Sequence, residues 1–60
     1  MTHSVLFSPT STLCCLVTAY PDGYHRRTLF ENTSSLVNYC NECAIPVALS
    51  DCRVTDDFLS

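Results

Sequence analysis

Residues 20–24, with the sequence YPDGY, constrain the fold of this 60-residue chain more than any other feature. Pro21 presets φ for the first corner of a type I turn, and Asp22 suits the second corner. Gly23 can adopt the left-handed conformation that closes such a turn as a bulge. Because three-residue loops of this kind connect antiparallel strands, we predict a β-hairpin over about residues 12–30.

The segments on both sides of this turn have the composition of strands. Their sequences, TLCCLVTAY and YHRRTLF, are rich in β-branched and aromatic residues. The turn sets a register with these cross-strand pairs: Leu16 with Thr28 and Cys14 with Phe30 on one face, Cys15 with Leu29 and Val17 with Arg27 on the other. The first face is the better candidate for burial.

A short helix is predicted after the hairpin, over about residues 33–44. Asn32, Thr33 or Ser34 can cap its first turn, because their side-chain oxygens accept hydrogen bonds from exposed N–H groups. Pro46 disfavours helical backbone at the residue before it and so ends the helix. Apolar residues recur at helical spacing along this segment: Leu36, Cys40, Cys43 and Val47.

These elements predict a small α+β fold in a single domain spanning residues 1–60. Residues 1–11 and 53–60 are expected to be irregular or frayed. A chain of this length buries only about 60% of the surface that its unfolded form exposes, so its core is small. We expect a hairpin and one helix to leave part of the large apolar side chains exposed: Leu6, Phe7, Leu16, Tyr20, Tyr24, Phe30 and Tyr39. Because exposed apolar patches mark partner surfaces, the first functional hypothesis is a small interaction or accessory protein, binding a partner protein or itself.

The C-x-x-C pair, Cys40 and Cys43, suggests a second hypothesis, a zinc-stapled mini-domain. Thiolates are good zinc ligands, and metal binding would supply folding free energy that a small core lacks. Cys14 and Cys15 in the hairpin would complete a tetrahedral site with the helix pair, and His25 and Cys52 are alternative ligands. A second C-x-x-C, or a pair of histidines at zinc-ligand spacing, is not found in the sequence. The first hypothesis, an interaction protein, predicts no cofactor, and the second predicts zinc.

The sequence argues against an enzyme. Its Cys, His and Asp residues have no spacing that would orient them as a catalytic group, and its one glycine is required by the turn. A net charge of −3 without a basic stripe argues against nucleic-acid binding. The longest apolar run, LCCLVTAY, is far shorter than the roughly 20 residues of a membrane-spanning helix, so no transmembrane segment is expected.

Cysteine content bears on the compartment of the chain. Five cysteines would leave one thiol without a partner in a disulfide framework, and the first residues carry no Lys or Arg. Both observations favour an intracellular, reduced chain over a secreted one. Lys, Gln and Trp are absent altogether. This bias keeps a third hypothesis open, an open reading frame without selected function.

Overall fold

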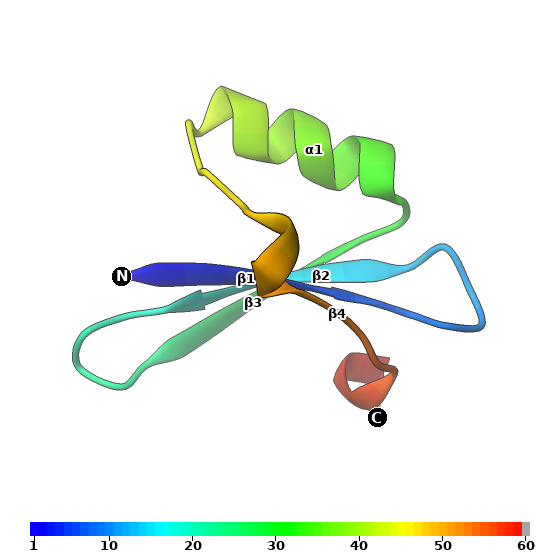
Figure 1. Cartoon of the computed structure of the whole chain (residues 1–60), viewed down its shortest axis with the longest axis horizontal. Coiled ribbons are helices and arrows are strands. Elements are labelled where there is room, and N and C mark those ends of the chain that lie inside the picture. The colour runs from blue at the N-terminus through cyan, green and yellow to red at the C-terminus, as the bar shows by residue number, and fades with distance from the viewer. Residues whose placement is uncertain (60) are drawn as a thin grey trace.

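The computed structural model describes residues 1–59 and shows a small α+β fold, as predicted. Four strands form one sheet in the order β3-β2-β1-β4, and a single α-helix covers one face of it (Figure 1). The elements are β1 (Thr2–Phe7), β2 (Cys14–Ala19), β3 (His25–Phe30), α1 (Thr33–Glu42), the 3-10 turn η1 (Leu49–Asp51), β4 (Cys52–Val54) and the 3-10 turn η2 (Asp57–Leu59).

Strands β2 and β3 form the predicted hairpin, with the predicted register. The pairs Leu16–Thr28 and Cys15–Leu29 lie opposite one another. The turn closes through a 3.0 Å hydrogen bond from the Gly23 N–H to the Tyr20 carbonyl, and Gly23 has a φ of 92°. Next to the turn, the rings of Tyr20 and Tyr24 lie with centroids 5.7 Å apart, which adds cross-strand contact.

Strand β1 corrects the expectation that residues 1–11 are irregular. It pairs antiparallel with β2 along six residues and parallel with β4, so it lies inside the sheet. The physical reason is that β2 is almost wholly buried. Its main-chain groups on the side away from β3 need a second hydrogen-bonding partner, and β1 supplies it.

The C-terminal part, residues 53–60, is also more ordered than expected within the described residues. Arg53 and Val54 belong to β4, which pairs parallel with the end of β1. The Thr55 N–H then donates to the Phe7 carbonyl at 2.9 Å, and η2 comes next in the chain. Cys52 packs against the core, which draws this strand onto the sheet edge.

Helix α1 begins where the sequence predicts. The Asn32 side chain accepts a 2.9 Å hydrogen bond from the Ser35 N–H, which caps the first turn. The helix ends at Glu42, two residues before the predicted end. After the capping residue Cys43, Ala44 has a φ of 54°, and the Ile45 N–H returns to the Cys40 carbonyl at 2.9 Å.

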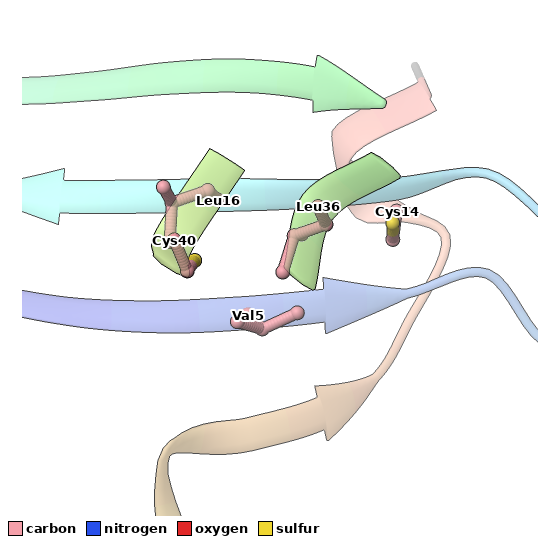
Figure 2. Packing of buried hydrophobic residues seen from close by; sticks show 5 residues of the cluster. All are labelled: Val5, Cys14, Leu16, Leu36 and Cys40. Carbon is pink, nitrogen blue, oxygen red and sulfur yellow. The ribbon is translucent and has the colours of Figure 1, made fainter. Parts of the chain in front are cut away.

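The core lies between α1 and the sheet. Its most buried members come from β1, β2 and α1, and they face one another across the layer (Figure 2): Val5, Cys14, Leu16, Leu36 and Cys40. Larger, half-buried side chains close the margins of this cluster, including Phe7, Phe30 and Tyr39. None of the helices within residues 1–59 has the length and apolar character needed to cross a membrane.

Candidate interaction surface

The four cysteines proposed as zinc ligands do not meet at one point. Cys14 and Cys40 lie in the core between sheet and helix. Cys15 comes directly after Cys14 on a strand, so its side chain points to the opposite face of the sheet. Cys43, at the end of α1, is exposed. Within residues 1–59 no three Cys, His, Asp or Glu side chains are grouped so that they could hold a metal ion.

The environment of the buried thiols also works against metal binding. Burial raises the pKa of Cys14, Cys15 and Cys40 above the ordinary thiol value of 9.0. A smaller contribution from the neighbouring thiol raises the pKa of Cys14 and Cys40 further. The thiolate is the form that binds zinc, and burial disfavours this form. Residues 1–59 therefore show no preformed zinc site.

A different feature carries binding capacity, the outer side of β3. Within residues 1–59 this strand pairs only with β2, and no strand lies along its other side. We call this outer side the β3 edge. Four of its six side chains are exposed: His25, Arg26, Arg27 and Leu29. The sequence predicts the strand but not its place at the edge of the sheet. That place results from the pairing of β1 with the other side of β2, which no local sequence pattern indicates.

Main-chain groups of β3 alternate between β2 and the β3 edge. The Tyr20 N–H donates to the Tyr24 carbonyl at 2.8 Å, just before the strand begins. Counting from that bond, antiparallel alternation directs every second residue towards β2. The residues whose N–H and C=O groups point outward are therefore His25, Arg27 and Leu29.

Two hollows, one on each face of the sheet, extend to β3. The helix-side hollow has a volume of about 380 Å³, and its lining includes Tyr39, Ile45 and Arg26. The open-side hollow, on the face without α1, has a volume of about 390 Å³. Its lining consists of the apolar residues Leu6 and Val17 and of several polar residues. Arg26 and Arg27 are neighbours, yet they line different hollows because adjacent strand residues point to opposite faces.

The charges around the two hollows differ from those of the whole chain. All three arginines of the chain line one of them: Arg26 the helix-side hollow, Arg27 and Arg53 the open-side hollow. Of the six acidic residues of the chain, Asp51 alone contributes to these linings. Both hollows are thus net cationic in a protein whose net charge is −3.

Apolar side chains accompany this cationic surface. Leu29 on the β3 edge is 59% exposed, and Tyr24 at the end of the hairpin is 61% exposed. Both are large apolar side chains at solvent-facing positions. Leu29 lies on β3, and Tyr24 directly precedes this strand. Open main-chain groups, apolar side chains and positive charge therefore coincide along β3.

Comparisons with known proteins give no match: neither a protein-family model, nor a curated protein, nor a solved structure is similar to this chain at a significant level.

Proposed function

We propose that this chain is a non-enzymatic interaction protein that binds an extended segment of a partner by strand addition along the β3 edge. The observation that carries the proposal is a six-residue strand with one side open. In strand addition, main-chain hydrogen bonds supply affinity and alternate side chains supply specificity. His25, Arg27 and Leu29 offer the outward main-chain groups.

The other edge of the sheet supports the choice of β3. Strand β4 has only three residues, and a very short edge strand is a common protection against unwanted pairing. Strand β3 is twice as long and contains no proline. Its one apolar exposed side chain, Leu29, would pack against an alternate residue of the added strand.

A binding role also agrees with the state of the buried cysteines. Cys14 and Cys40, with raised pKa values, lie inside the core, where a substrate would not reach their thiols. Catalytic cysteines instead lie in electropositive, partly exposed surroundings. These residues contribute volume to the core rather than chemistry.

The proposal is tested by selecting binding peptides from a random display library and mapping where they bind. We expect the selected peptides to slow amide hydrogen exchange at His25, Arg27 and Leu29. Leu29→Pro removes one outward N–H without breaking a hydrogen bond to β2, because proline is tolerated at such edge positions. This variant should lose binding, whereas Leu29→Ala keeps the N–H and should retain most of it.

Equal binding by the Leu29→Pro variant and the wild type would count against strand addition. Slower amide hydrogen exchange that is confined to residues outside β3 would also count against strand addition. Chemical shifts of the β2 amides in each variant report whether the hairpin is intact, so a loss of folding is not mistaken for a loss of binding.

A further inference from the structure

The chain contains one adjacent pair of arginines and one adjacent pair of acidic residues. The arginines, Arg26 and Arg27, lie on the β3 edge and are exposed. The acidic pair, Asp56 and Asp57, lies after β4 and is exposed too. Each pair is followed within two residues by apolar side chains, which gives the two segments, RRTLF and DDFL, complementary patterns.

We propose that the segment added to the β3 edge is residues 56–59 of a second copy of this chain. This inference rests on the proposed function and names the partner. In parallel register, Arg26 lies opposite Asp56 and Arg27 opposite Asp57. Leu29 then lies opposite Leu59, so that one apolar pair comes after two opposite-charge pairs. Opposite-charge and apolar cross-strand pairs both stabilise sheets.

The two hollows favour this register because they accept the acidic side chains on both faces. Neighbouring residues of an added strand point to opposite faces. Asp56 would therefore extend towards the helix-side hollow, whose lining contains Arg26 and no carboxylate. Asp57 would extend towards the open-side hollow, where two arginines outnumber Asp51. In antiparallel register, the same charge pairs would place Val54 opposite Leu29 and so take Val54 out of β4. The parallel direction leaves Val54 in β4.

Sheet order requires that the pairing occur between copies. Strands β1 and β2 separate β4 from β3, so β3 and β4 lie at opposite edges of the sheet. Reaching the far side of β3 from Thr55 means crossing about four strand spacings, roughly 19 Å. Asp56 follows Thr55 directly, and consecutive Cα atoms lie only about 3.8 Å apart, so residue 56 cannot reach the β3 edge of its own chain while Thr55 stays in place. Two copies that exchange these segments cover the β3 edge of each copy in one closed dimer.

Residues 57–59 form the short 3-10 turn η2. The Leu59 N–H donates to the Asp56 carbonyl at 3.0 Å, and the Asp57 N–H donates to the Thr55 hydroxyl at 3.3 Å. Phe58 is half-buried, and Leu59 is 44% exposed. A short turn at the margin of a sheet opens at lower cost than the central strands, so residues 56–59 can extend while Thr55 stays bound to Phe7.

Sedimentation velocity over a concentration series, in the presence of a thiol reductant, tests the inference. We expect the wild type to form a dimer that weakens as salt rises, because charge pairs at a surface are screened. Arg26→Glu/Arg27→Glu and Asp56→Arg/Asp57→Arg should each weaken self-association by about tenfold or more, since each replaces two attractive pairs by two repulsive ones. An equimolar mixture of these two variants restores opposite charges at both contacts and should dimerise again.

A matched control separates strand pairing from general attraction between oppositely charged proteins. Adding Leu29→Pro to both variants leaves every charge unchanged and removes the outward N–H of residue 29. The mixture should then stay monomeric. Continued association of this mixture would overturn the inference, because the contact would not depend on the β3 edge.

Two further outcomes would overturn it. A wild type that stays monomeric at all concentrations is one, and a wild type that dimerises no more strongly than both charge-reversal variants is the other. The proposed function is distinguished by its own measurement. If foreign peptides protect the amides of His25, Arg27 and Leu29 while the chain does not self-associate, strand addition stands and the second copy is not the partner.

Discussion

Ala44 is the one non-glycine residue within residues 1–59 that has a positive φ, 54°. It directs the chain from the end of α1 back to the core, where Ile45 and Val47 pack. Left-handed backbone suits glycine, and an alanine there costs free energy because of its Cβ atom. Pro46 indicates that the helix ends before it, but no local sequence pattern identifies Ala44 as the left-handed residue. Gly23, in contrast, is identified by the residues around it.

Replacing Ala44 by glycine should therefore stabilise the protein. We expect the free energy of unfolding to rise by about 0.5–1 kcal/mol, because the relief of left-handed strain exceeds the conformational entropy that glycine adds to the unfolded chain. Urea denaturation followed by circular dichroism measures this change. Ala48 has an extended backbone with φ −92°, so Ala48→Gly is a control expected to lower stability. A loss of stability in Ala44→Gly would contradict the account.

At the scale of elements, the locally specified features are predictable from the sequence and the non-local ones are not. The hairpin turn and the Asn32 cap each depend on a few neighbouring residues. Strand β1 depends on partners distant in sequence, Cys52 in β4 and Leu16 in β2, which both lie opposite Val5. For the site, the sequence predicts β3 only as a hairpin strand, because an edge is defined by the absence of a neighbour in space.

The open face of the sheet gives a prediction about the C-terminal turn. Cys15 is only 2% exposed although it points away from α1. The turn η2, with half-buried Phe58, lies on that side of the sheet (Figure 1). Phe58→Ala should expose Cys15, increase its rate of alkylation several-fold and bring its raised pKa closer to the ordinary value.

Mass spectrometry of peptides after brief alkylation would measure the modification of each cysteine separately. Leu59→Ala is the matched control, because Leu59 is 44% exposed and its truncation removes less buried surface. An unchanged rate at Cys15 in Phe58→Ala would show that other residues cover this thiol.

At the scale of the whole molecule, one small core joins the helix to the sheet. Three thiols with raised pKa values are buried in the fold: Cys14, Cys15 and Cys40. The unfolded chain releases their protons at a lower pH than the folded chain does. Stability is therefore fully present below the ordinary thiol pKa and is lost as pH rises above it.

We expect a single cooperative unfolding transition whose urea midpoint is lower at about pH 10 than at about pH 7. Cys15→Val removes one of the three thiols and should reduce this pH dependence. A poorly folded chain with no cooperative transition would instead agree with an open reading frame without selected function. A midpoint that rises with pH would contradict the burial of the thiols.

The order of the strands also affects how the chain acquires its structure during synthesis. Strands β1, β2 and β3 are complete by residue 30, whereas β4 begins only at Cys52. A nascent chain that has not yet reached Cys52 therefore presents two open sheet edges, β1 as well as β3. Strand β4 closes one of these edges, so a chain that terminates before Cys52 would form a sheet prone to aggregate from both sides.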